Sequence, residues 1–367
     1  MNVLSSGTEK HGMDLLEAVY EMMIQDGYLR WRGGPVLSTF GGHEARFGDW
    51  GWPGFIERLN ERLDGKIMFI PAFFMPPKDF LTLPYVDGAF NWNSAWPQGD
   101  HSANVVEDEA FCEDPISFQV KPYMAAVSPL FFTHYGSSGE WAFNKNFIYR
   151  SDDLLYPWRW HALLSLPPNK SPNIIQIISW NDHGESHAIA PVRHNQPGSE
   201  EWTKDMPHEA FREMTRYFVR RWRDGLGEVE EFAPQSKGDL ESTVKVWGWW
   251  RCHSKDLKAS DDPVGEPVHA DWARDLLNFL IVVPETSSPF HMVVHNGPNP
   301  QPHHLESGKA NLITIPFVPG LVGFEVMEGS TDVIISASGK EIADQIQKYN
   351  FNMWGGSWEV KVGVRPS

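Results

Sequence analysis

The first part of the chain alternates short apolar runs with segments that carry apolar residues at helical spacing. Near-continuous apolar runs are typical of strands buried on both faces of a parallel sheet. Apolar residues three or four positions apart are typical of amphipathic helices. We therefore predict β/α units with helices outside a parallel sheet. The predicted strands are residues 35–40, 66–74, 88–92, 122–127 and 174–180, and the predicted helices are residues 14–26, 52–63, 78–83, 103–112, 151–166 and 206–223.

The number of strands constrains the architecture. Five strands of parallel type are predicted, whereas a closed (β/α)8 barrel needs eight. The chain also begins almost directly with a helix that would normally follow an earlier strand. The sheet is therefore either open or a barrel whose first units are absent. In both cases functional side chains are expected at the C-terminal ends of the strands.

The pattern changes in the last third of the chain. Residues 227–241 are polar and acidic without periodicity, and we expect them to form a linker between a first domain, 1–226, and a second, 242–367. Short alternating segments separated by turn residues then predict a β-sandwich. The predicted strands of this domain are residues 243–250, 275–283, 291–295, 312–317, 322–327 and 332–336.

Charge and composition narrow the classes of partner. The net charge of −17 and the pI near 5.3 disfavour nucleic acid and anionic membrane surfaces. A neutral ligand is compatible with them, and the 17 Trp residues offer flat rings for the C–H faces of sugars. We expect a monomer. The first ten residues carry no signal peptide, and the longest apolar stretch, residues 276–283, is too short to span a bilayer.

The densest group of polar residues follows the last predicted strand of the first domain. Asp182 and Glu185 lie three residues apart there, and we expect Gly184 to let the backbone turn sharply between them. Two carboxyl groups facing one bond are what acid/base cleavage of a glycoside requires. A capping or solvated loop is the alternative interpretation, and the apolar strand before the pair counts against it. Trp180, Asn181, His183 and His187 surround the two acids in sequence.

Two further segments carry candidate substrate contacts. The strand at residues 88–92 is flanked by polar and aromatic residues, of which Trp96 is as compatible with a core position as with a sugar contact. The segment after the strand at 122–127 is a long aromatic loop. The candidate contacts in the two segments are Asp87, Trp92, Asn93 and Trp96, then Tyr123, Ser128, His134, Asn144 and Asn146.

A metal site is a minority interpretation of the same cluster. His183, Glu185 and His187 stand at alternate positions, with His134 or His43 as a further ligand. The order of residues differs from H-E-x-x-H, and the segment is not helical. The sequence contains no phosphate loop, dinucleotide-binding turn or serine nucleophile elbow. We therefore expect neither a metal nor another cofactor.

Residues 180–187 read W-N-D-H-G-E-S-H. They resemble the W-N-D-[YF]-G-E-S-H signature of the fungal α-1,3-glucanases, or mutanases, of glycoside hydrolase family 71. Further stretches resemble this family in the same order along the chain, from about residue 14 to the C-terminus. They are residues 34–42, 87–92, 95–97, 123–129, 144–146, 206–208 and 349–352.

This resemblance implies a (β/α)8 barrel followed by a β-sandwich, and hydrolysis of α-1,3-glucan with inversion of configuration. It places Asp182 and Glu185 on the family's catalytic acids. We also expect Trp180, Asn181 and His187 to contact the substrate. We expect Glu185 to donate the proton and Asp182 to activate water, and the reverse assignment is nearly as compatible with the sequence. The family's location is extracellular or in the cell wall.

The chain departs from the family pattern at its start. Family members carry three strands before the segment at residues 34–42, and a secretion signal, so we expect this chain to be a truncated product or an incomplete gene model. A catalytically inactive glucan-binding relative and a metal-dependent hydrolase are the competing functional hypotheses.

Overall fold

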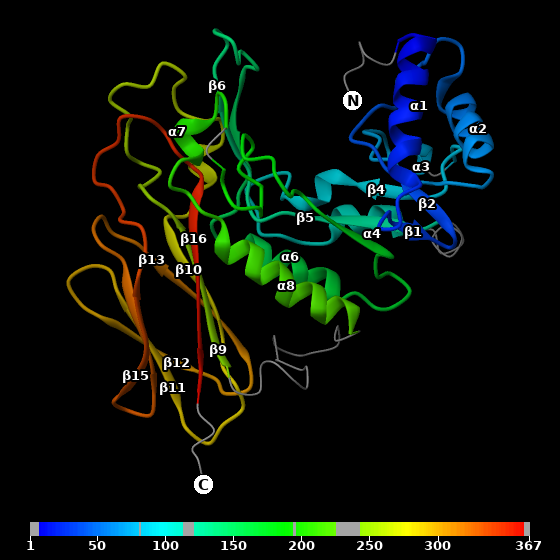
Figure 1. Cartoon of the computed structure of the whole chain (residues 1–367). Helices are drawn as coiled ribbons and strands as arrows, with labels where there is room; N and C mark the ends of the chain where they lie inside the picture. Colours follow the sequence, from blue (N-terminus) through cyan, green and yellow to red (C-terminus); the bar gives the residue numbers. More distant parts are fainter. Residues whose placement is uncertain (1–6, 81, 113–120, 194–195, 225–242, 363–367) are drawn as a thin grey trace. The chain divides into compact units, whose positions relative to one another are not determined.

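The computed structural model describes residues 7–80, 82–112, 121–193, 196–224 and 243–362 (Figure 1). Contacts divide the chain into two compact units. The first unit comprises Met1–Ala95, Val105–Ala126 and Pro167–Gln176, and the second comprises Trp96–Asn104, Val127–Leu166 and Ile177–Ser367. The predicted linker, 227–241, lies outside the described residues, and the predicted domain boundaries stay a prediction.

Parallel pairing organises the strands of the first part of the chain, as the apolar runs predict. Strand β2 pairs in parallel with β3, and β4 pairs in parallel with β5. Backbone hydrogen bonds from Gly88 N to Phe69 O and from Phe90 N to Pro71 O connect the β3 and β4 segments. Strand β8 lies on the other side of β5. The bounds are β2 Gly34–Leu37, β3 Met68–Phe69, β4 Ala89–Asn91, β5 Tyr123–Val127 and β8 Ile174–Ile177.

The order of these strands in space therefore follows their order in the sequence. The short strand β1 (Arg30–Trp31) runs antiparallel beside β2, so the pairing of this part is not purely parallel. Every residue of β2, β4 and β5 is buried, which explains why these strands read as continuous apolar runs. The regular strands are shorter than predicted, although Ala72 N donates to Thr39 O and Phe40 forms a parallel bridge with Ala72 beyond the ends of β2 and β3.

The helices follow the predicted pattern with shifted ends. Helix α1 (Glu9–Met23) begins five residues before the predicted start, because the Thr8 side chain accepts a hydrogen bond from His11 N and caps the first turn. Its buried face packs against α2. The other helices are α2 Gly51–Leu63, α3 Pro77–Phe80, α4 Val106–Cys112, α6 Leu155–Leu164, α7 Glu200–Thr203 and α8 Glu209–Arg223, with 3₁₀ turns η2 at Trp92–Ala95 and η3 at Ala270–Trp272.

The helix predicted from residue 151 starts with Ser151, Asp152 and Asp153, residue types that favour a helix cap, but none of them caps it. Leu154 is the N-cap residue of α6, with φ 67° and no side-chain hydrogen bond to the helix. The Asp152 carboxylate instead accepts two hydrogen bonds of 2.8 Å from Arg274 N and one of 3.1 Å from Arg251. A long-range contact within the second unit has therefore replaced the local cap that the sequence favours.

Two antiparallel sheets of four strands form the C-terminal part of the second unit, as predicted (Figure 1). Their strand orders are β13-β10-β9-β16 and β12-β11-β14-β15. Buried side chains from both sheets form one hydrophobic cluster that includes Trp250, Phe279, Met292 and Phe324. The bounds are β9 Thr243–Arg251, β10 Leu276–Val282, β11 Phe290–His295, β12 Gln301–Leu305, β13 Ala310–Pro316, β14 Gly323–Glu328, β15 Asp332–Ser338 and β16 Met353–Lys361.

Sequence patterning missed two of these strands. Strand β12 reads Q-P-H-H-L, and β16 contains Gly355 and Gly356 at its centre, so both lack the apolar alternation of a typical strand. A Cβ on Gly356 would lie 2.6 Å from the Trp358 ring and 2.7 Å from the Trp354 ring. The glycine therefore leaves room for two indoles on one face of the sheet.

Helix α8 joins the sheets to the segment that follows β8. It packs against β9 and β16, and a Cβ on Gly355 would lie 3.1 Å from Ala210 Cβ. His208, just before the helix, forms a parallel bridge with Gly355. In the part of the chain that the structure describes, no helix has the length and apolar character needed to cross a bilayer.

Arg251 provides a test of the second unit's stability. It is 1% exposed and pairs with Asp152 and Asp275. Replacing it in Arg251→Met leaves two carboxylates without their cation, and we expect a loss of about 3–5 kcal/mol in the free energy of unfolding, measured by urea denaturation. Arg216→Met is the control, because its pair with Glu213 lies at the surface and should contribute about 0–1 kcal/mol. Equal losses in the two variants would contradict the assignment.

Candidate active site

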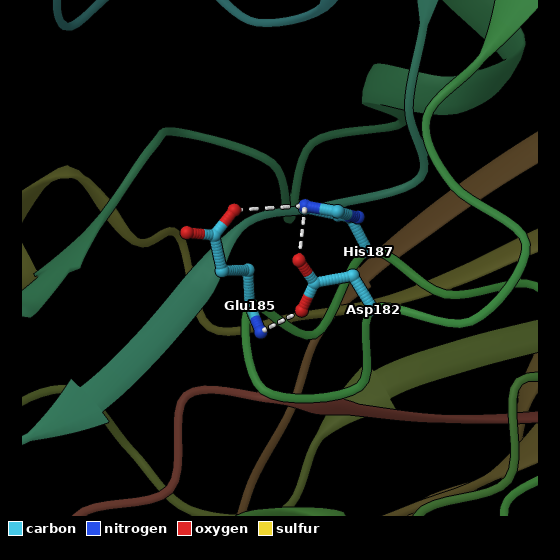
Figure 2. A group of neighbouring side chains, drawn as sticks. All are labelled: Asp182, Glu185 and His187. Carbon is cyan, nitrogen blue, oxygen red and sulfur yellow. Dashed lines mark hydrogen bonds and ion pairs between the residues drawn. The ribbon is translucent and has the colours of Figure 1, made fainter. Parts of the chain in front are cut away.

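The turn after β8 is closed by its own side chains. The Ser179 hydroxyl accepts a hydrogen bond from Asp182 N at 3.0 Å, and Asp182 Oδ1 accepts one from Glu185 N at 3.0 Å. Ser179 N donates to His187 O at 2.9 Å, which brings the two ends of the turn together. The backbone is therefore fixed before any ligand arrives. Asp182 and Glu185 project from the same short loop, as the sequence predicts (Figure 2).

His187 lies between the two carboxylates. Its Nε2 is 3.0 Å from Glu185 Oε2 and 3.9 Å from Asp182 Oδ2, and Figure 2 shows both acids directed toward this nitrogen. Its Nδ1 is 2.9 Å from Ser179 Oγ. The Ser179 hydroxyl accepts a hydrogen bond from Asp182 N and can donate its own hydrogen to Nδ1 of His187. That leaves the Nε2 proton of His187 to donate to Glu185.

Burial sets the environment of this histidine. The side chain of His187 is 1% exposed, and its ring lies 5.8 Å from the rings of both Trp96 and Phe131. An apolar wall on one side and two carboxylates on the other hold the imidazole in one orientation. His187 is buried and lies between the two carboxylates, and its contact with substrate stays a prediction.

Lys145 is a charged neighbour that sequence reasoning did not select. Its Nζ lies 2.7 Å from Glu185 Oε1. Partial burial acts to raise the pKa of Glu185, but hydrogen bonds and charges from His187 and Lys145 outweigh it and lower that pKa to about 2. Glu185 is therefore ionised at neutral pH in the ligand-free site. The Asp182 carboxylate is more exposed, with 48% of its side-chain surface accessible.

Lys145 reaches this position because of strand register. Strands β6 (Phe132–Tyr135) and β7 (Lys145–Ile148) form an antiparallel hairpin in which Tyr135 pairs with Lys145. Phe132 N donates to Glu185 O at 3.2 Å, which joins the hairpin to the catalytic turn. The sequence indicated this region only as an aromatic loop at residues 134–146. That pattern does not give the register of the hairpin, so it could not place Lys145 beside Glu185.

Gly184 is required for a reason other than the one predicted. Its φ is not positive; the positive φ in this turn, 59°, belongs to Ser186. A Cβ on Gly184 would lie 2.3 Å from the Tyr135 hydroxyl, and Gly184 O accepts a hydrogen bond of 3.2 Å from Trp202 Nε1. The glycine therefore allows two aromatic side chains to pack directly against the turn.

The possible metal ligands differ from the predicted set. Within the described residues, one group brings three ligand atoms within 4.8 Å of one another, and it consists of Asp182, Glu185 and His187. The Lys145 ammonium already neutralises Glu185, so a cation would have to compete with it. The other proposed ligands, His183, His134 and His43, lie outside this group. His183 is buried, and burial followed by the charges of His208 and His187 lowers its pKa to about 4.

Three predicted substrate contacts are exposed in the second unit. Trp180 is 62% exposed and immediately precedes Asn181 and Asp182, and Asn181 is also exposed. Asn144 is exposed beside Lys145 and adopts φ 51°. These side chains are accessible to a ligand at the carboxylates, and their contact with substrate stays a prediction.

Four other predicted contacts have buried structural partners instead. Trp96 and Ser128 both direct their polar hydrogens to Leu130 O. His134 lies 2.9 Å from Asp262 and 2.7 Å from Asn146, and the Asn146 amide donates to backbone carbonyls at residues 264–266. These contacts connect the hairpin with the loop near residue 262. The polar atoms of Trp96, Ser128, His134 and Asn146 therefore already have partners within the protein, and their contact with sugar stays a prediction.

The remaining candidates belong to the first unit. Tyr123 is 1% exposed and donates to Asp108 at 2.7 Å, and Asp87 accepts from Phe69 N and pairs with Lys66. Both therefore have structural partners within the first unit, and their predicted contacts with sugar stay a prediction. Trp92 is partly exposed and packs 4.6 Å from the ring of exposed Phe40, and Asn93 is also half-buried. A sugar contact by Trp92 or Asn93 stays a prediction.

The model of glycosyl hydrolase family 71 matches residues 6–365. The chain belongs to this family. It is 29% identical over 342 residues to Mutanase Pc12g07500 from Penicillium rubens, covering 90% of this chain and 67% of that one. It is 28% identical over 349 residues to Glucan endo-1,3-alpha-glucosidase agn1 from Schizosaccharomyces pombe, covering 94% of this chain and 76% of that one.

More distant similarities agree with this family or add nothing to it. The Ascus wall endo-1,3-alpha-glucanase of Schizosaccharomyces pombe is 26% identical over 257 residues, which cover 67% of this chain and 54% of that one. The solved GH99 endo-alpha-mannosidase from Bacteroides thetaiotaomicron matches 60% of this chain and 64% of that one, with 14% identity and a TM-score of 0.37. That structural likeness is too weak to inform on the fold. Family membership confirms the predicted resemblance and makes this chain a glycoside hydrolase.

The Lys145–Glu185 pair makes a prediction about ionisation. In Lys145→Met the carboxylate loses a cation at 2.7 Å, so the pKa of Glu185 should rise from about 2 toward the ordinary value near 4. The ¹³C NMR titration of the Glu185 carboxyl carbon, assigned by its disappearance in Glu185→Gln, measures this shift. Lys145→Arg keeps the charge and should keep the low pKa. An unchanged titration in Lys145→Met would show that the ion pair does not control Glu185.

Proposed function

We propose that this chain is an endo-acting hydrolase that cleaves α-1,3-glucosidic bonds of α-1,3-glucan. The observation that carries the proposal is the pair Asp182 and Glu185, held on one turn around the Nε2 of His187. Its place in a chain of glycosyl hydrolase family 71 supports this assignment, as do the names of two relatives, an endo-1,3-alpha-glucosidase and an endo-1,3-alpha-glucanase.

The two carboxylates provide the proton donor and the water activator. The sequence favoured Glu185 as donor, and in that role Glu185 must take up a proton that its ligand-free environment disfavours. Binding of a sugar that displaces Lys145 from Oε1 would remove part of that penalty. If Lys145 stays in place, an ionised Glu185 is suited to activate water. Which limb of the pH–rate profile moves in Lys145→Met therefore assigns the role: the alkaline limb for a donor and the acidic limb for a base.

Inversion of configuration places a further demand on this site. The nearest ligand atoms of Asp182, Glu185 and His187 lie within 4.8 Å of one another, whereas inverting sites separate their carboxyl groups by about 6.5–9.5 Å to admit a water. We propose that the Glu185 side chain leaves His187 when the glucan binds and so opens the space for this water. Its bonds to His187 and Lys145 are both made through the carboxylate, so the movement needs no change of the backbone.

We further propose that the parallel strands belong to a (β/α)8 barrel. The sequential order of β2, β3, β4, β5 and β8 is the order of neighbouring barrel strands, and the catalytic turn follows β8 at its C-terminal end. The two antiparallel sheets correspond to the sandwich expected after the barrel. α-1,3-glucan is uncharged and thus compatible with the acidic chain. An extracellular or cell-wall location is proposed from the family resemblance, and a monomeric state stays a prediction.

Removal of either carboxylate tests the catalytic assignment. Asp182→Asn and Glu185→Gln should each lower kcat on α-1,3-glucan by about 10²–10⁴-fold, because each removes one proton-transfer group, while thermal unfolding stays close to wild type. Glu201→Gln changes an exposed glutamate on α7 and should leave activity unchanged. Full activity in both site variants would overturn the proposal. Glucan binding without product release by the wild type would support the non-catalytic alternative.

The metal hypothesis has its own outcome in the same assay. The site described here needs no cation, so activity should persist after exhaustive dialysis against a chelator. Loss on chelation and recovery on adding a divalent cation would favour metal-assisted hydrolysis by Asp182, Glu185 and His187.

The stereochemical outcome tests the proposed opening of the carboxylate pair. ¹H NMR during the first minutes of cleavage should show β-configured reducing ends appearing from the α-linked chain, as inversion demands. Initial release of the α-anomer would indicate retention. In that case Glu185 and Asp182 work at the short separation seen in the ligand-free structure, without the proposed side-chain movement.

A further inference from the structure

A strip of aromatic rings leads away from the catalytic turn along the β6–β7 hairpin. Tyr135, the last residue of β6, packs its hydroxyl against Gly184 between the two acids. The Phe143 ring lies 4.9 Å from the Tyr135 ring at 89°, and the Trp141 ring lies 6.1 Å from the Phe143 ring at 52°. These three residues form what we call the hairpin strip. It joins the carboxylates to the connection between the two strands.

The outer rings of this strip are accessible. Phe143 is 56% exposed and Trp141 is 37% exposed, although burying an aromatic side chain is favourable by about 1.5–3 kcal/mol. The neighbouring Asn144 is exposed too and supplies an amide beside the rings. Large apolar side chains that remain exposed next to an active site mark a surface for a ligand.

The rings of the hairpin strip are held in place by packing against neighbouring residues. Gly198, with φ 78°, has space for no side chain, because a Cβ there would lie 2.4 Å from Trp141 Cγ. The indole is therefore supported by a backbone segment. At the inner end, Trp202 packs 5.0 Å from the Tyr135 ring and donates to Gly184 O. Backbone hydrogen bonds from Phe143 N to Trp141 O and from Asn144 N to Gly136 O close the connection.

We propose that the hairpin strip is a binding site for the part of the glucan chain that extends beyond the bond being cleaved. The proposal rests on the proposed function and adds the position and chemistry of a polymer subsite. The C–H faces of glucose units stack on aromatic rings, and the polar edges of Tyr and Trp accommodate the hydroxyl groups around them. The ligand is a neutral α-linked glucan, because the inner end of the strip adjoins the carboxylates that hold the scissile bond.

The hairpin also links binding to chemistry. Lys145 follows the strip directly in sequence and pairs with Tyr135 across the hairpin, and its ammonium binds Glu185. A glucan lying along the strip therefore approaches Lys145, whose ammonium pairs with Glu185. The strip thus selects for chains long enough to cover it, which is the property expected of an enzyme that cleaves within a polymer.

Binding as a function of chain length tests this site. In the Glu185→Gln background, calorimetry with α-1,3-linked glucose oligosaccharides of increasing length should show affinity rising with length. Trp141→Ala and Phe143→Ala should each lose about 3- to 10-fold of the affinity for the longer chains, which corresponds to one stacked ring. Trp141→Phe keeps a flat ring and should retain most of the affinity. Trp158→Ala removes an indole of similar exposure, 39%, on α6 and should bind every length as the background does.

The outcomes separate this inference from the proposed function. Unchanged length dependence in both alanine variants, with an unaltered near-ultraviolet circular dichroism spectrum, would overturn the hairpin strip as a subsite and leave the catalytic assignment intact. Failure of the wild-type chain to bind or cleave any member of the series would overturn the proposed function and the subsite with it. Should an alanine variant unfold, Trp141→Phe and Phe143→Leu give the comparison on a folded protein, with Phe143→Leu expected to lose affinity for long chains.

Discussion

The hydrogen bond between His187 Nε2 and Glu185 Oε2, 3.0 Å long, is the contact on which the site depends. It works only because Ser179 fixes the other ring nitrogen and because the apolar wall around His187 excludes water. One buried donor thus holds the side chain of Glu185, whose backbone nitrogen is already hydrogen-bonded to Asp182. Without it, Glu185 would be positioned by an exposed lysine alone, and surface ion pairs of that kind hold geometry poorly.

The elements around the turn explain how the fold supplies that rigidity. The hairpin β6–β7 contacts the turn through Phe132 and Lys145, and the buried contacts of His134 fasten the same hairpin to the loop near Asp262. On the other side, His208 Nδ1 donates a hydrogen bond to Ala188 O, and its Nε2 lies 2.8 Å from Oδ1 of Asn352, the residue before β16. The C-terminal sheets therefore contribute to the site's geometry within the second unit, although none of the proposed catalytic groups belongs to them.

The sequence predicted the parallel strands, the antiparallel strands of the C-terminal part and the turn that carries Asp182 and Glu185, because each has a local pattern. It could not predict which polar side chains face inward. Ser128, His134 and Asn146 lie near strand ends, where substrate contacts are expected, yet their polar atoms form hydrogen bonds with other parts of the protein. Asp152 likewise accepts a hydrogen bond from Arg251 instead of capping a helix. Lys145 was missed for the complementary reason, since the register of a hairpin and the distance to Glu185 leave no trace in composition or spacing. Strand β16 was missed because two of its positions are glycines, of which Gly356 leaves room for neighbouring indole rings.

The charge state of the ligand-free site has a consequence for how such a hydrolase is switched on. With a pKa of about 2 in the ligand-free site, Glu185 cannot donate a proton at neutral pH, and further burial would raise that pKa. Under the proposed function, binding of a glucan would add burial and, along the hairpin, would compete with Lys145 for the same carboxylate. Substrate binding would therefore favour protonation of Glu185 and separate its carboxyl group from His187. Cleavage would then depend on occupation of the hairpin strip. A site arranged in this way spends little time protonated without its polymer and needs no change in the backbone of the turn to become active.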